Sequence, residues 1–93
     1  QTTLDIESRA TRRAVSELDL RGVTVIEAEL MVDEYIDECS LSGLKVVSVI
    51  HGKGTGALRA AVQQRLKRNK LVESYRLGTF GEGESGVTIV TLK

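Results

Sequence analysis

The stretch KVVSVI-HGKGTG-ALRAAVQQRLKRN, residues 45–69, carries the signals for a strand, a turn and a helix in immediate succession. Its β-branched start, residues 45–50, predicts a strand that is buried on both faces or nearly so. Three alternate glycines in residues 51–56 predict a turn whose backbone N–H groups meet an anion at the start of a helix. That helix is expected to run to about residue 69, because apolar residues recur at helical spacing: Leu58, Ala61, Val62 and Leu66.

A strand and a helix are also indicated before this stretch. Residues 16–20 alternate polar and apolar side chains, as in a short strand. Thr24 and Glu27 have the spacing of a capping box, so a helix is expected to begin there and to stop at Ser42-Gly43. One face of this helix is apolar: Val25, Ala28, Val32, Tyr35, Ile36 and Cys39.

Two more strands are expected at residues 72–77 and 87–92, with the glycine-rich loop 78–86 between them. The order is therefore strand, helix, strand, helix, strand, strand, and the fold class is α/β. Each strand–helix–strand unit predicts a right-handed crossover with parallel pairing, whereas the last two strands can pair antiparallel. We expect a two-layer α/β sandwich with a four-stranded mixed sheet and two helices over residues 15–93, preceded by an arm or linker end at residues 1–14.

The composition is that of one globular domain. The 93 residues, 41% of them hydrophobic, suffice for a single modest core. With no Trp and one Phe, the surface is expected to lack aromatic platforms for stacking single-stranded nucleic acid. Cys39 cannot form an intramolecular disulfide and no apolar leader or membrane span is evident, so we expect a cytoplasmic protein with no membrane partner. Because the chain starts with Gln1, we expect a domain excised from a longer parent chain with other domains.

Opposite charges are segregated along a chain whose net charge is zero. Residues 22–44 carry acids and no base: Glu27, Glu29, Asp33, Glu34, Asp37 and Glu38. Residues 51–72 carry bases and no acid: Lys53, Arg59, Arg65, Lys67, Arg68 and Lys70. Two explanations are open at this point. Either two solvated helix faces of opposite sign attract one another, or the basic helix presents positive potential to a polyanion such as a phosphate backbone.

Three blocks of sequence resemble the signature blocks of the Smr (small MutS-related) domain. They are residues 18–22 (LDLRG), 51–59 (HGKGTGALR) and 83–90 (GESGVTIV), in the order and at the spacing of that family. Many stand-alone Smr proteins have LDxH in the first block, whereas Arg21 resembles the version at the C-terminus of recombination-suppressing bacterial MutS paralogues. The resemblance implies a fold similar to the C-terminal domain of translation initiation factor three, which agrees with the element order.

The resemblance also implies an endonuclease domain of weak sequence specificity that nicks or cleaves DNA, branched DNA included, in suppression of homologous recombination. The implied catalytic residues are Asp19, Arg21 and His51: Asp19 orients or assists His51, and Arg21 contacts phosphate. Crevices in open α/β sheets lie at the C-terminal ends of parallel strands, where Asp19 and His51 are expected. Nucleic acid is then bound by the turn and the helix after it, through Gly52, Lys53, Gly54, Thr55, Gly56 and Arg59.

Each of these residues also has a structural alternative. His51 is a turn residue, Asp19 a cap for the turn after its strand, and Arg21 a surface partner of the acidic helix. Thr55 either donates its hydroxyl to a phosphate or caps the helix. The glycines are needed for positive φ angles in the turn, a conformational role that they have with or without a ligand.

Three function classes are open: a DNA endonuclease, a non-catalytic module that binds DNA, RNA or the ribosome, and a dinucleotide site. The third rests on Gly52-x-Gly54-x-x-Ala57 with Glu73 about twenty residues on, but the chain is too short for two mononucleotide-binding halves. No cofactor is identified, and no His, Cys and carboxylate cluster has the spacing of a metal cage. A loosely held Mg²⁺ ion bridged by substrate phosphates would leave no such pattern.

Overall fold

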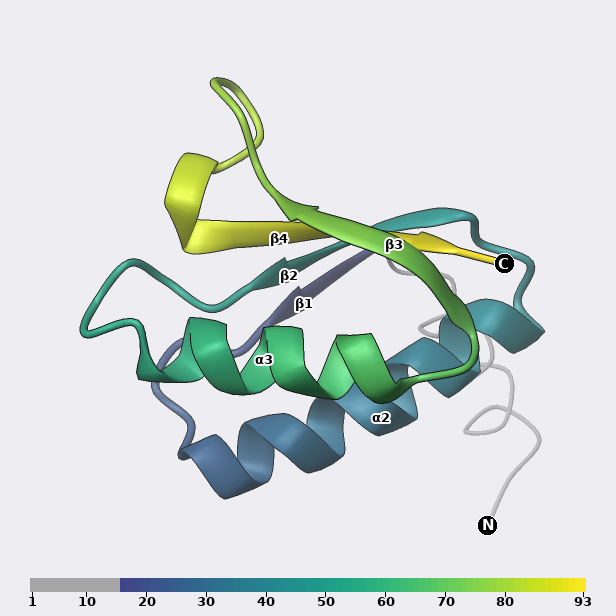
Figure 1. The fold of residues 1–93 in the computed structure, drawn as a ribbon, viewed down its shortest axis with the longest axis horizontal. Helices are drawn as coiled ribbons and strands as arrows, with labels where there is room; N and C mark the ends of the chain where they lie inside the picture. Colours follow the sequence, from purple (N-terminus) through teal and green to yellow (C-terminus); the bar gives the residue numbers. More distant parts are fainter. Residues whose placement is uncertain (1–15) are drawn as a thin grey trace, which may run out of the picture.

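The computed structural model describes residues 16–93, so the arm expected at residues 1–14 lies outside the described residues, as does Val15. The elements follow the expected order, and their bounds differ from the predicted ones by a single residue at most. They are β1 (Glu17–Asp19), α2 (Val25–Leu41), β2 (Val46–Ile50), α3 (Ala57–Arg68), β3 (Val72–Leu77), the 3-10 turn η1 (Glu84–Gly86) and β4 (Val87–Leu92). The four strands form one layer and the two helices the other, as the expected two-layer sandwich requires (Figure 1).

Helix α2 begins at the predicted capping box. The N–H of Glu27 donates to Oγ1 of Thr24 (3.2 Å), and the N–H of Thr24 donates to Oε1 of Glu27 (2.9 Å). Two N–H groups that the first helical turn leaves without a partner are satisfied in this way. The predicted apolar face is buried except for Val25, which is exposed at the start of the helix; the buried members are Ala28, Val32, Tyr35, Ile36 and Cys39.

The strand order in the sheet is β1-β2-β4-β3. β1 pairs parallel with β2, and β3 pairs antiparallel with β4, as expected. The expected parallel pairing of β2 with β3 is wrong, because β4 lies between them and is antiparallel to both. β4 is buried along nearly its whole length, as its central position in the sheet requires.

One face of the sheet carries the core and the other is uncovered by helices (Figure 1). β2, expected to be buried on both faces, therefore alternates: Val47 and Val49 are buried in the core, while Val46 is exposed. The main core residues come from both layers: Val32, Ile36, Val47, Val49, Val62, Leu66, Val90 and Leu92. Among residues 16–93, no helix has both the length and the apolar character needed to cross a membrane.

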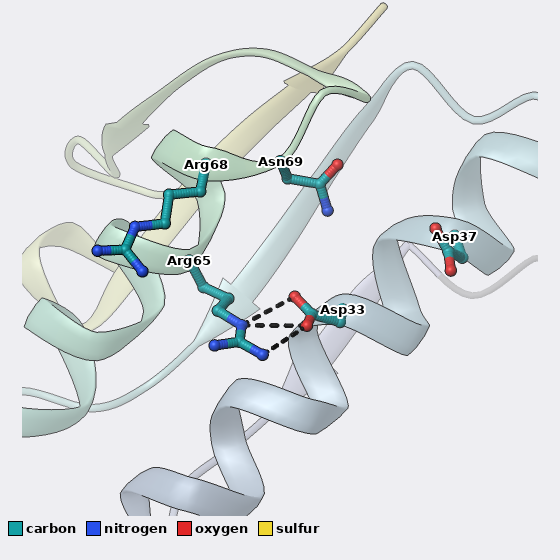
Figure 2. Close-up of a pocket in the computed structure, with 5 residues that line it drawn as sticks. All are labelled: Asp33, Asp37, Arg65, Arg68 and Asn69. Atoms are coloured by element: carbon teal, nitrogen blue, oxygen red, sulfur yellow. Dashed lines mark hydrogen bonds and ion pairs between the residues drawn. The ribbon is translucent and has the colours of Figure 1, made fainter.

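Arg65 joins α3 to α2. Its guanidinium donates from Nε and Nη2 to Oδ2 of Asp33, at 3.0 and 2.8 Å (Figure 2). It also lies 4.0 Å from a carboxylate oxygen of Glu29. For this basic residue, the attraction between helices of opposite charge is confirmed. Arg65 is therefore engaged within the fold rather than free for a polyanion.

Candidate functional site

The three blocks of sequence meet at one end of the sheet. β1, β2 and β3 end there and β4 begins there, since Asp19 lies beside Ile50, Ile50 beside Val87 and Leu77 beside Thr88. The segments that follow these strands all leave the sheet on the left side of Figure 1. Backbone hydrogen bonds fix them: the N–H groups of His51 and Gly52 both donate to the carbonyl of Gly86, at 3.1 and 2.9 Å.

Asp19 holds Arg21 in place. The guanidinium of Arg21 donates from Nε to Oδ1 (3.0 Å) and from Nη2 to Oδ2 (2.7 Å), and the backbone N–H of Arg21 also donates to Oδ1 (3.0 Å). These hydrogen bonds, led by the guanidinium, lower the pKa of Asp19 to about 2. Asp19 thus forms the turn cap that the sequence allowed, while the partner of Arg21 is this carboxylate rather than the acidic helix.

His51 is buried, with only 4% of its surface exposed. Its Nδ1 lies 2.9 Å from the carbonyl oxygen of Gly52 and its Nε2 lies 2.8 Å from Oγ1 of Thr88. A carbonyl only accepts, so Nδ1 carries the proton, and in the neutral ring Nε2 accepts from the Thr88 hydroxyl. Asp19 was expected to orient His51, but Thr88 and Gly52 do so in the structure.

The glycine turn forms a small pocket at the start of α3. Gly52 and Gly56 have φ angles of +82° and +88°, in the left-handed region that side chains rarely adopt. The pocket has a volume of about 90 Å³ and is lined by His51, Gly52, Gly54, Thr55, Gly56, Ala57, Leu58 and Arg59. The first turn of α3 has no acidic residue and Gly56 supplies no side-chain cap, so no carboxylate of the helix offsets the positive end of its dipole. Thr55 is a weak cap, with Oγ1 3.3 Å from the N–H of Ala57.

A second, larger groove lies on the uncovered face of the sheet. It has a volume of about 830 Å³, and both Arg21 and Lys53 line it. Lys53 forms an ion pair with Glu84, with 3.5 Å between Nζ and Oε1. The side chains of Arg21 and Lys53 are 65% and 63% exposed, so both cations are accessible to a ligand despite their carboxylate partners.

Sequence reasoning missed Thr88 and Phe80. Thr88 is fully buried, and the available signal was a lone hydroxyl on the inward face of the apolar strand GVTIV. Phe80 is 93% exposed in the loop after β3, contrary to the expected lack of aromatic surface. Within the described part of the chain, no group of three or more His, Cys, Asp or Glu residues is arranged to hold a metal ion.

Residues 18–93 match the sequence profile of the Smr domain. The chain belongs to the Smr family. It is 55% identical over 78 residues to Endonuclease MutS2 of Ruminiclostridium cellulolyticum, covering 84% of this chain and 10% of that protein. It is 50% identical over 93 residues to Endonuclease MutS2 of Clostridium novyi, covering 100% of this chain and 11% of that protein. The chain thus spans only about a tenth of the length of these curated relatives.

Solved structures of Smr proteins have the same fold. The Smr domain of Thermus thermophilus MutS2 superposes with a TM-score of 0.82 at 51% identity, covering 85% of this chain and 99% of that one. YdaL, a stand-alone small MutS-related protein from Escherichia coli, superposes with a TM-score of 0.80 at 30% identity, covering 84% of this chain and 64% of that one. The two-layer α/β architecture is therefore that of the family.

Proposed function

We propose that this Smr domain binds DNA and nicks its phosphodiester backbone, including that of branched DNA. The relatives named Endonuclease MutS2 support this reaction class. The observation that carries the proposal is the turn pocket, where the N-terminus of α3 and Arg59 border the same small space. Backbone N–H groups, a helix N-terminus and a guanidinium together form an anion site that suits a phosphate group.

The cations next to the pocket extend this site along a phosphate backbone. Asp19 uses Nε and Nη2 of Arg21, which leaves Nη1 for a phosphoryl oxygen. Lys53 exchanges Glu84 for a phosphate, since their ion pair is long and solvent-exposed. In the reaction, water attacks phosphorus and one P–O bond breaks, giving a phosphate monoester and a hydroxyl. Arg21 neutralises the charge that builds on the phosphoryl oxygens in the transition state.

Asp19 and His51 act on this site by positioning other groups. Asp19, whose pKa is about 2, is too weak a base to take a proton from water near neutral pH, so it serves to orient Arg21. His51 is buried and uses both ring nitrogens, so it holds the carbonyl of Gly52 and the shape of the turn. Catalysis then depends on fixed cations, with any loosely bound Mg²⁺ supplied together with the DNA.

The test is a nicking assay on supercoiled and branched DNA, with and without chelator, alongside a DNA-binding measurement. Arg21→Lys keeps the charge and removes the forked geometry, so we expect nicking to fall about 100-fold with little change in affinity. Asp19→Asn should reproduce most of that loss. Lys45→Ala, at the far end of β2, is the control and should leave both quantities unchanged.

A non-catalytic nucleic-acid-binding module is the second candidate. The buried state of His51 favours it, because this histidine is not available to activate water in the described conformation. If the purified chain binds DNA but cuts none of the substrates under any metal condition, the endonuclease proposal fails and the binding module stands. Absence of binding to any DNA would contradict both.

A further inference from the structure

Phe80 is the most exposed of the large apolar side chains in the described residues, at 93% of its surface. It lies in the loop 78–83, which rises from the sheet on the side away from both helices (Figure 1). Single exposed apolar residues are common on protein surfaces, so exposure alone assigns no role. Two further observations concern the loop that carries this ring and the groove beside it.

Hydrogen bonds of Glu82 connect the loop to the end of β3. The carboxylate of Glu82 accepts hydrogen bonds from Nη1 and Nη2 of Arg76, at 2.8 and 3.1 Å. It also accepts from the N–H and the hydroxyl of Thr79, both at 2.9 Å. The N–H of Gly78 donates to the carbonyl of Val87 (2.9 Å) and closes the base of the loop. Phe80 is therefore presented on a fixed support, which reduces the entropy lost when the ring binds a ligand.

The residues next to Phe80 form one wall of the groove that also contains Arg21 and Lys53. Gly81, Glu82 and Gly83 line this groove, and its floor is the uncovered face of the sheet, with Val87 and Ile89 among the floor residues. Glycine is required at position 83, where φ is +99° and an added Cβ would collide with the side chain of Val87. The groove thus combines an apolar floor with two accessible cations, and Gly81 in its wall directly follows the exposed Phe80 in the sequence.

This combination fits a nucleotide whose base is not paired. Cations recognise phosphates in any DNA, but an aromatic ring can stack only on a base whose flat face is free. In continuous duplex both faces of each base are already covered by neighbouring bases. Single-stranded segments and branch points expose such faces, and apolar side chains inserted at base steps favour unstacked DNA.

We infer that Phe80 stacks on an unpaired nucleobase of DNA whose adjacent phosphates bind Arg21 and Lys53. The inference rests on the proposed function and names its substrate class: DNA with unpaired bases at a branch or gap. The loop 78–83 selects such DNA, while the turn pocket binds phosphate in duplex and branched DNA alike.

The experiment compares two DNAs of equal length, a blunt duplex and a three-way junction with unpaired bases that include 2-aminopurine. Phe80→Ala should weaken junction binding by about 5- to 100-fold, the range that loss of one stacked base gives, and change duplex binding less than about 2-fold. The change in 2-aminopurine fluorescence on binding should disappear in Phe80→Ala and persist in Phe80→Trp. Leu41→Ala, which removes another exposed apolar side chain at the far end of α2, should alter neither.

Three outcomes would overturn the inference. If Phe80→Ala weakens binding to both DNAs equally, or to neither, then Phe80 does not recognise unpaired bases. A change in sedimentation of the Phe80→Ala chain without a change in DNA binding would assign the ring to a protein contact. In each of these cases the proposed function would stand if the wild-type chain nicks DNA and Arg21→Lys loses that activity. Failure of the wild-type chain to bind any DNA would contradict both the inference and the proposed function.

Discussion

At the residue scale, Thr88 determines how His51 is held. Its buried hydroxyl lies 2.8 Å from Nε2 of His51 and accepts a longer hydrogen bond of 3.4 Å from Nε2 of Gln63. The same imidazole binds the carbonyl of Gly52, so the ring links the central strand β4 to the glycine turn. The shape of the turn pocket therefore depends on a residue more than thirty positions away in the sequence.

Thr88→Val keeps the shape of the side chain and removes the hydroxyl. The buried Nε2 of His51 then lacks its partner, and we expect the free energy of unfolding to fall by about 1–3 kcal/mol. Urea denaturation measures this change. Thr91→Val, at a partly exposed position of the same strand, should change it by less than about 0.5 kcal/mol. Equal effects of the two substitutions would contradict the assigned hydrogen bond.

The Asp19–Arg21 pair predicts a specific pH dependence. Because the folded-state pKa of Asp19 is lowered from 3.8 to about 2, the pair contributes stability above pH 3.8 and loses it as the pH falls towards 2. Carboxyl chemical shifts of Asp19 should titrate near 2 in the wild-type chain and at a higher pH in Arg21→Gln, which keeps only the backbone hydrogen bond to the carboxylate. A midpoint near 3.8 in both chains would show that the pair does not form in solution.

At the element scale, separate roles are assigned to two of the three arginines of α3, Arg59 and Arg65. Arg59 lines the turn pocket, whereas Arg65 is bound to Asp33 of the neighbouring helix. Sequence alone placed both on one basic helix and could not separate them, because their difference depends on which face of α3 meets α2. The attraction between the helices therefore explains the charge of Arg65, whereas phosphate binding by Arg59 belongs to the proposed function.

These roles predict different salt dependences of DNA binding. Arg59→Ala should reduce the slope of log affinity against log salt by about 1, since one phosphate contact is lost. Arg65→Ala removes the same charge and should leave the slope nearly unchanged, with a stability loss below about 1 kcal/mol. Affinities measured between about 50 and 200 mM salt test this. Equal slopes for the two variants would mean that the helix acts only through its total charge.

Local signals were sufficient to predict the elements. The capping box at Thr24, the glycines at the ends of helices and the β-branched runs each act within a few residues, so their effect is readable in sequence. Strand pairing was predicted less well. The position of β4 between β2 and β3 depends on contacts between distant segments, and the rule for adjacent parallel strands did not apply.

At the scale of the whole molecule, the three blocks that carry the family resemblance lie at one end of the sheet, as the expected positions of Asp19 and His51 imply. The sequence could not indicate which atoms meet there. The partner of His51 depends on how β4 packs against the glycine turn, and the exposure of Phe80 depends on the path of the loop 78–83. No local pattern in the sequence indicates either of these two features.

The central position of β4 predicts that the domain cannot fold without its last strand. A chain that ends at residue 86 leaves the edges of β2 and β3 unpaired and removes buried Val90 and Leu92 from the core. We expect this chain to lack cooperative unfolding when followed by circular dichroism. A chain that ends at residue 92 is the control and should melt as the full one does. Cooperative melting of the shorter chain would contradict the role given to β4.

The same strand order bears on protein synthesis. A ribosome releases β1, β2 and β3 before β4, so the nascent chain holds two separate parts of the sheet until β4 emerges. The glycine turn and the loop 78–83 are bonded to one another through Gly86, immediately before that segment, and come together only when it docks. A nascent chain that stalls before β4 emerges would therefore leave the glycine turn and the loop 78–83 apart.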